Sequence, residues 1–236
     1  STSKSGTYAY LVTTSKTAYT DTSANAGTNY YYKVRALDSE NGLYSGYSPL
    51  VNRMCDLPRP TVSLSVNTAT GKPVVKRETV DGAAKYYVYR STQESSGYRK
   101  VYTAVKARSY EDTAAEAGTA YYYKVMAVHE KSSANSAYST EVNRVCDLAK
   151  PTVTLTLNSK GYPYLKWSEI DGALRYRVYR SESKSGTYDY IGATASLKYA
   201  DKTAEAGTKY YYKVRAIHEN SDANSAYSSA KAVTVK

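Results

Sequence analysis

The sequence GTNYYYKV at residues 27–34 decides the fold, because close copies of it occur twice more in the chain. It returns as GTAYYYKV at residues 118–125 and as GTKYYYKV at residues 207–214, 91 and then 89 residues further on. Other segments keep this spacing, such as Cys55-Asp56-Leu57 with Cys146-Asp147-Leu148. A unit near 90 residues is longer than a solenoid repeat and falls in the size range of a domain with its own core. The repeat therefore predicts a row of small domains.

The matched positions divide the 236 residues into three copies, which we name module 1 (1–57), module 2 (58–148) and module 3 (149–236). Module 1 enters the repeat halfway, because Ser1 to Tyr8 matches Ser181 to Tyr188, so its first three strands are missing. A half sandwich would expose its apolar inner face and open strand edges. Two explanations stay open. The chain is cropped from a longer ordered one, or another polypeptide supplies the missing strands.

Module 3 contains the strand signals of the repeat most completely. Short segments with a two-residue alternation are bounded by Gly, Pro, Asn or Asp, and no stretch has a helical period. The expected strands are residues 152–157, 164–167, 176–180, 188–191, 197–199, 208–217 and about 226–235. About seven short strands in one module indicate an antiparallel sandwich, so the predicted fold class is all-β.

Module 3 also carries a set of motifs, which are Trp167, Gly172-Ala173, Tyr176 to Arg180, Gly207 to Tyr210 and Lys213 to Ala216. In this order they resemble a fibronectin type III module of the bacterial kind, and the resemblance extends over essentially the whole chain. It implies tandem immunoglobulin-like (fibronectin type III) β-sandwiches, the first incomplete, with Trp167 in the core. It also implies a tyrosine corner, whose hydroxyl bonds to the backbone upstream. By motif match the corners are Tyr30, Tyr121 and Tyr210.

Module 2 departs from these motifs at one core position. Arg77 stands where module 3 has Trp167, within the segment Val75-Lys76-Arg77-Glu78. A charged side chain at a core position must either extend to solvent or disturb the packing. We therefore expect module 2 to differ from module 3 around this residue.

The composition limits the partners of the chain. There are 29 Tyr and no Phe, and 32 Lys and Arg against 21 Asp and Glu give a net charge of +11. The basic residues are scattered, whereas a nucleic-acid binder usually gathers them, so we expect no specific nucleic-acid binding. Weak attraction to teichoic acids, acidic polysaccharides or other polyanions fits better. No apolar run approaches the roughly 18 residues that cross a bilayer, so we expect no membrane span.

The cysteines and histidines recur at equivalent positions of the repeat. Cys55 and Cys146 should not pair, because a disulfide needs Cα atoms within about 7 Å and successive domains lie further apart. They are expected to be small buried residues, since Val235 holds the same position in module 3. His129 and His218 each follow the long strand with no second His at ligand spacing, so we expect surface residues at a strand end and no metal site.

Catalytic motifs are absent or lack their partners, which predicts that the chain is not an enzyme and needs no cofactor. Ser-x-x-Lys at Ser1 to Lys4 and Ser181 to Lys184 lacks the companion motifs of a penicillin-binding protein. The repeated carboxylates, which are Asp112, Glu116, Asp201 and Glu205, fall near strand ends and turns. A glycosidase would need a carboxylate pair in a cleft, which a bare sandwich does not suggest.

Strand alternation predicts a mixed aromatic and basic surface, which we name the Tyr/Lys face. If Tyr210, Tyr212 and Val214 point into the core, the residues between them point outward beside those of the paired strand. The outward residues are Arg177, Tyr179, Tyr211, Lys213 and Arg215 in module 3 and Tyr87, Tyr89, Tyr122 and Lys124 in module 2. Two interpretations stay open: the face binds sugars or polyanions, or cross-strand pairs order a solvated surface.

These observations favour non-catalytic spacer or stalk modules of a large extracellular or cell-surface bacterial protein. The linkers carry Pro58, Pro60 and Pro151, which limit flexing between neighbouring modules of the same long chain. Two alternatives remain. The Tyr/Lys face could serve adhesion to cell-wall or host glycans and polyanions, or the chain could be a filament subunit whose residues 1–57 are completed by strands of another chain.

Overall fold

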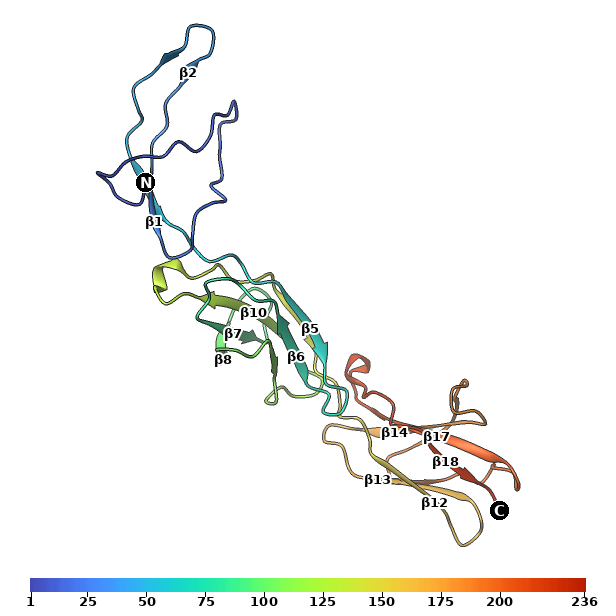
Figure 1. The fold of residues 1–236 in the computed structure, drawn as a ribbon. Coiled ribbons are helices and arrows are strands. Elements are labelled where there is room, and N and C mark those ends of the chain that lie inside the picture. Colours follow the sequence, from blue (N-terminus) through green and yellow to red (C-terminus); the bar gives the residue numbers. More distant parts are fainter.

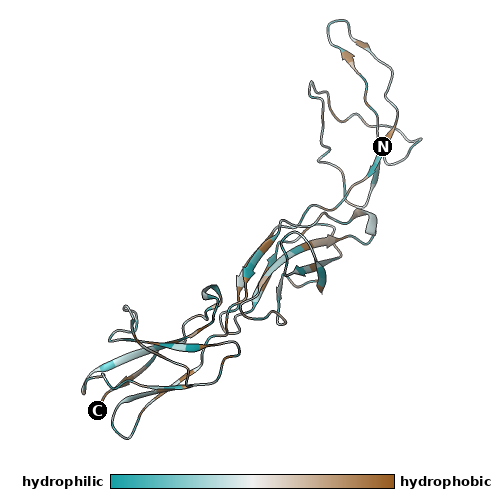
Figure 2. Cartoon of the chain, turned by 180° about the vertical axis from the view of Figure 1, so that it is seen from behind, coloured by the Kyte–Doolittle hydropathy of each residue, from teal (hydrophilic) through white to brown (hydrophobic).

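The computed structural model describes all residues, 1–236, as strands, turns and two 3₁₀ turns, with no α-helix. The chain is elongated, with module 1 at one end, module 2 in the middle and module 3 at the other end (Figure 1). Hydrophobic and hydrophilic segments interleave along the modules instead of forming separate blocks (Figure 2). The all-β prediction is confirmed.

Module 3 is a sandwich of two antiparallel sheets. Its three-stranded sheet has the order β12 (Val153–Leu157), β13 (Pro163–Trp167) and β16 (Lys198–Ala200). Its four-stranded sheet has the order β15 (Asp189–Thr194), β14 (Arg175–Ser181), β17 (Lys209–Ile217) and β18 (Lys231–Thr234). The 3₁₀ turn η2 (Ser221–Ala223) follows β17.

Module 2 repeats this arrangement strand for strand. One sheet has the order β5 (Val62–Val66), β6 (Pro73–Arg77) and β9 (Ser109–Glu111). The other has the order β11 (Val142–Val145), β10 (Ala120–Val128), β7 (Lys85–Ser91) and β8 (Arg99–Ala104), and η1 (Ser132–Ala134) follows β10.

Each complete module has its own hydrophobic core, built by the alternation of its long strand. In β17, Tyr210, Tyr212, Val214 and Ala216 are buried, while the residues between them are half-buried. Trp167 packs in the same core, with its ring 5.2 Å from that of Tyr176. Because side chains of a strand alternate between the two faces of a sheet, a single sequence pattern yields both a dry and a wet face.

Two serines shorten the last strand of each module relative to the sequence prediction. In module 3, the hydroxyls of Ser225 and Ser228 accept hydrogen bonds from the backbone N–H groups of Ala216 and Val214, both at 2.9 Å. These hydroxyls take the place of strand carbonyls, so residues 225–230 run beside β17 without a regular ladder. The predicted strand from about 226 therefore begins only at Lys231. Ser136 and Ser139 do the same in module 2, and Ser45 and Ser48 in module 1.

Module 1 has only isolated pairs of short strands. β1 (Asn29–Tyr32) pairs with β4 (Val51–Met54), and β2 (Leu37–Asp38) pairs with β3 (Leu43–Tyr44). Ser1, which matches Ser181 at the end of β14, exchanges backbone hydrogen bonds with Tyr31. Within residues 1–236, Ser1 is the only residue that pairs with this edge of β1, whose other edge pairs with β4.

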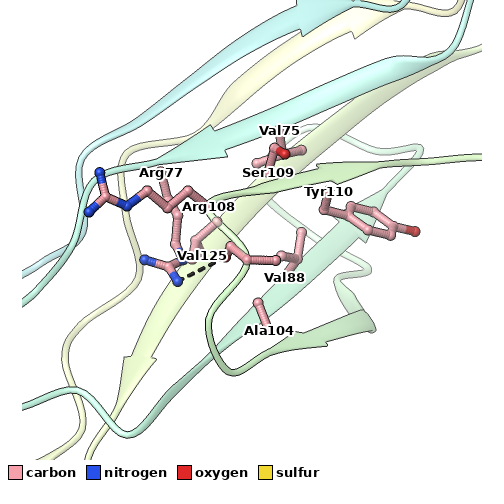
Figure 3. Close-up of a pocket in the computed structure, with 9 residues that line it drawn as sticks. Val75, Arg77, Val88, Ala104, Arg108, Ser109, Tyr110 and Val125 are labelled. Carbon is pink, nitrogen blue, oxygen red and sulfur yellow. Dashed lines mark hydrogen bonds between the residues drawn. The ribbon is translucent and has the colours of Figure 1, made fainter.

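Arg77 is buried in module 2, with only 8% of its surface exposed, which corrects the expectation that it must reach solvent or disturb the packing. Its guanidinium lies 3.3 Å from the ring centroid of Tyr86. Its Nη2 donates to the carbonyl of Ala107 at 2.8 Å, which is the dashed line in Figure 3. A cation stacked on an aromatic ring replaces the contact of Trp167 with Tyr176. Burial lowers the pKa of Arg77. The pocket beside it measures about 10 Å³, room for one water at most.

Candidate functional site

The sheet brings the residues of the predicted Tyr/Lys face together. In module 3, β14 and β17 place Tyr179 opposite Lys213 and Arg177 opposite Arg215, while Ser181 lies opposite Tyr211. In module 2 the equivalent register places Tyr89 opposite Lys124, with Tyr87 and Tyr122 on the same two strands. Directly opposite residues on one face of a sheet are close enough to interact.

Edge-to-face tyrosines order the centre of this face. The Tyr179 ring lies 5.1 Å from that of Tyr227 at 81° and 5.9 Å from that of Tyr190 at 65°. Tyr89 repeats the arrangement with Tyr138, at 5.1 Å and 89°. Burial, together with the neighbouring Tyr138 hydroxyl, raises the pKa of Tyr89 to about 12. Tyr138, Tyr190 and Tyr227 were missing from the predicted face. Tyr138 and Tyr227 hold equivalent positions of the repeat, which was a signal for these two.

Each lysine of the face lies over a tyrosine ring of its own module. Lys213 Nζ lies 3.9 Å from the centroid of Tyr188, and Lys124 Nζ lies 4.2 Å from that of Tyr98. Glu141 also pairs with Lys124 at 3.3 Å and accepts a hydrogen bond from the Tyr98 hydroxyl. These cations are already engaged within the module, which supports a face ordered by its own cross-strand contacts. Arg177 remains exposed and faces solvent.

The repeated aspartates lie in the interior, each bound to an arginine and a tyrosine. Asp201 accepts hydrogen bonds from Arg180 and Tyr212, both at 2.9 Å, and from Thr203 at 2.8 Å. Burial by itself would raise the pKa of Asp201, but these hydrogen bonds outweigh it and hold the pKa below the ordinary 3.8. Burial and the bond to Asp201 raise the pKa of Tyr212. A carboxylate with every partner in the fold holds two sheets together and cannot reach a substrate.

Asp112 occupies the equivalent position in module 2. It accepts from Arg90 at 2.8 Å and from the Tyr123 hydroxyl at 2.8 Å, and none of its surface is exposed. A hollow of about 520 Å³ beside the turn between β7 and β8 is lined by basic, hydroxyl and amide residues, without a carboxylate or imidazole.

The tyrosine hydroxyls at the predicted corners differ among the modules. The hydroxyl of Tyr121 accepts from the backbone N–H of Glu116, and that of Tyr30 accepts from the N–H of Asn25, both at 3.1 Å. Tyr210 is buried beneath Arg180, whose guanidinium lies 4.5 Å from its ring.

Neither cysteine forms a disulfide, and no group of three or more His, Cys, Asp or Glu side chains is arranged to hold a metal ion. Cys146 is fully buried and Cys55 half-buried. No helix of sufficient length and apolar character to cross a lipid bilayer is present.

The joint between modules 2 and 3 is a compact contact of backbone and side chains. The backbone N–H of Leu148 donates to the carbonyl of Ala223 at 2.7 Å, and the Leu148 side chain packs in the core of module 3. Ala117 of module 2 packs against the same core. The His218 ring lies over Gly118, where a Cβ would meet its Cε1 at 2.3 Å. Gly118 also has φ +82°, so both the contact and the backbone require glycine.

The joint between modules 1 and 2 uses the equivalent positions of the repeat. Leu57 N–H donates to the carbonyl of Ala134 at 2.9 Å, and Ala26 packs against the core of module 2. The His129 ring lies over Gly27, again 2.3 Å from the Cβ that glycine lacks. Lys131 Nζ donates to the carbonyl of Gly27 at 2.9 Å, as the amide of Asn220 does to that of Gly118 at 3.4 Å.

His129 and His218 are thus joint residues, which corrects the expectation of free surface residues at a strand end. The Nδ1 atom of each accepts a backbone N–H two residues on, which fixes the ring against the glycine of the preceding module. The equivalent position in module 1 is Asp38. The recurrence of His129 and His218 at one repeat position, together with the recurrence of Gly27 and Gly118, was the available sequence signal.

Known proteins resemble the chain in sequence and in fold, although no protein-family model matches it. Exoglucanase B of Cellulomonas fimi is 28% identical over 245 residues, covering 95% of this chain but only 22% of that protein. An amylopullulanase of Thermoanaerobacterium saccharolyticum is 35% identical over 77 residues, covering 31% of this chain and 6% of the relative.

Among solved structures, the chicken interferon gamma receptor alpha chain superposes with a TM-score of 0.56 at 14% identity, over 75% of this chain and 97% of that one. This likeness concerns the fold alone. The chain spans less than a quarter of either relative, so its similarity to enzymes is confined to a minor part of their length. With the module motifs and the two-sheet topology, these likenesses show that the chain consists of tandem fibronectin type III-like modules.

Proposed function

We propose that the modules are a non-catalytic spacer in a large bacterial extracellular protein that acts on polysaccharides. The enzymes named above support the setting, since each resembles the chain over a minor share of its own length. A spacer separates two other domains of the same chain by a set distance.

The observation that carries this proposal is the joint, which is built twice from equivalent positions of the repeat. Only two residues, Ala149 and Lys150, separate Leu148 from the buried Pro151, and Leu148 itself belongs to the core of module 3. The histidine and glycine contact then restrains rotation about that short connection. Direct contacts on both sides of so short a connection oppose the relative motion expected of loosely linked domains.

A distance measurement tests the proposal. Spin labels at Arg99→Cys and Lys231→Cys report the separation of modules 2 and 3, in a chain where Cys55→Val and Cys146→Val copy the Val235 of module 3. We expect a single narrow distance distribution that broadens in the His218→Ala variant. His129→Ala is the matched control, because it acts on the other joint and should leave the distribution unchanged. A broad distribution in the parent chain would contradict a rigid spacer.

Carbohydrate or polyanion binding by the Tyr/Lys face is the second candidate function. The observation that favours it is the exposed aromatic and cationic surface around Arg177, Tyr190 and Tyr227. Binding of the full chain to a glycan and polyanion array, lost in a Tyr211→Ala, Lys213→Ala variant, would support adhesion. An array without specific binding would exclude it and leave the spacer.

A further inference from the structure

The turn at Gly207 of module 3 repeats the glycine half of the joint but has no partner. Its φ of +80° matches the +76° of Gly27 and the +82° of Gly118. A Cβ at Gly207 would meet nothing within 4 Å, whereas at the other two glycines it would strike a histidine ring. No packing contact therefore requires this glycine within the structure itself.

The residues around Gly207 are those of a joint surface as well. Ala206 stands where Ala26 and Ala117 pack against the core of a following module, and here it is exposed. The carbonyl of Gly207 has no hydrogen-bond partner, while those of Gly27 and Gly118 accept from a Lys or Asn side chain. The N–H of Gly207 donates to the carbonyl of Val235, as that of Gly118 does to Cys146, so the turn is already held in the docking conformation.

We propose that the turn at Ala206-Gly207 is a docking surface for another module of this repeat that carries a histidine in the loop after its long strand. The ring of that histidine covers Gly207, and the Lys or Asn two residues later donates to the Gly207 carbonyl. This inference rests on the joint geometry and holds whether or not the array is a spacer.

The same geometry excludes a second copy of the whole chain as the partner. The histidines of modules 2 and 3 are occupied by Gly27 and Gly118 of their own chain. The open end of module 1 presents Asp38 on the hairpin of β2 and β3 instead of a histidine. The occupant must therefore be a module whose histidine loop is not yet engaged.

An extended chain tests the proposal. Residues 148–236 are appended after Lys236, which reproduces the repeat, because Val235 and Lys236 align with Cys146 and Asp147. In this chain, glycine-labelled NMR spectra follow the α-protons of Gly27, Gly118 and Gly207. The first two serve as internal references, since each already lies under a histidine ring.

We expect the Gly207 α-protons to move upfield to the range of Gly27 and Gly118 when the fourth module is appended. His218→Ala in the appended module alone should return them to their position in the original chain. The same substitution in module 3 should change the α-proton shifts of Gly118 and leave those of Gly207 at their upfield position. Unmoved Gly207 signals beside a folded fourth module would overturn the proposal, as would a shift that persists in the appended His218→Ala variant.

Discussion

Modules 1 and 3 share the segment Tyr-Tyr-Tyr-Lys-Val but bury it to opposite extents. Val34 of module 1 is 71% exposed, whereas its counterpart Val214 in module 3 is fully buried, as is Val125 in module 2. Seven residues of β17 pair with β14, but the equivalent strand beside β1 is represented by Ser1 alone. The same strand sequence is therefore buried only where a neighbouring strand pairs with it and completes the sandwich.

The aspartate of the hydrogen-bonded group also differs between modules 1 and 3 in how completely its partners surround it. Asp21 of module 1 still accepts from the Tyr32 hydroxyl at 3.0 Å, as Asp201 does from Tyr212. The arginine that completes the group in module 3, Arg180, belongs to the strand that module 1 lacks. A hydrogen-bonded group of this kind stabilises the fold only when all its members are present.

Supplying the missing strands should produce the largest effect. Fusing a copy of residues 149–180 in front of Ser1 restores the repeat order, since Ser1 aligns with Ser181. We expect module 1 to unfold cooperatively with a free energy of about 5 kcal/mol or more, the usual minimum for a folded domain. Hydrogen exchange at Val34 measures it. Exchange as fast as in the parent chain would show that the neighbouring strand is not what module 1 lacks.

Removing the arginine of the interior group should be the next largest effect. Arg180→Ala leaves the Asp201 carboxylate buried without its cation, and we expect a loss of about 3 kcal/mol in the unfolding free energy of module 3. Denaturation followed by Trp167 fluorescence reports this module alone, because the chain has a single Trp. Asp21→Ala is the control in module 1 and should leave the Trp167 transition in place. An unchanged denaturation midpoint for Arg180→Ala would show that the bond between Arg180 and Asp201 does not stabilise module 3.

Acid should remove part of the same contribution. The pKa of Asp201 is lowered in the folded state, so the stability that its carboxylate contributes is present above the ordinary value of 3.8 and is lost as the pH falls through the folded-state pKa. The Trp167 transition of module 3 should therefore shift to lower denaturant concentration below about pH 4. In Asp201→Asn this part of the pH dependence should disappear. If Asp201→Asn keeps the full acid-induced shift of the Trp167 transition, groups other than Asp201 cause that shift.

The smallest expected effect distinguishes module 2 from module 3. Arg77 Nε is buried without a hydrogen-bond partner, and the residues that accept from its other nitrogens, Glu78 and Ala107, are exposed and can bond to water. Arg77→Met keeps the length of the side chain and removes the buried charge, so we expect module 2 to gain about 1 kcal/mol. Calorimetry of the full chain measures it, with Lys76→Met on the exposed side of β6 as control. A loss of stability would show that stacking on Tyr86 stabilises module 2 by more than the burial of the guanidinium destabilises it.

The sequence was sufficient for most strands, the two faces of β17 and the burial of Trp167, because each follows from a two-residue alternation or a local motif. The start of the last strand was predicted too early, because the serine hydroxyls replace its ladder. The stacking of Arg77 on Tyr86 was not predictable, since it depends on how two sheets pack across the core. The joints were missed for a similar reason. Lys131 and Gly27 are 104 residues apart, and no local pattern indicates that they touch.

The central claim is that the histidine joints make neighbouring modules one rigid body. Residual dipolar couplings of modules 2 and 3, measured in one aligned sample of the full chain, test it most directly. The account predicts that a single alignment tensor fits both modules and that His218→Ala separates it into two. Two different tensors in the parent chain would contradict the claim.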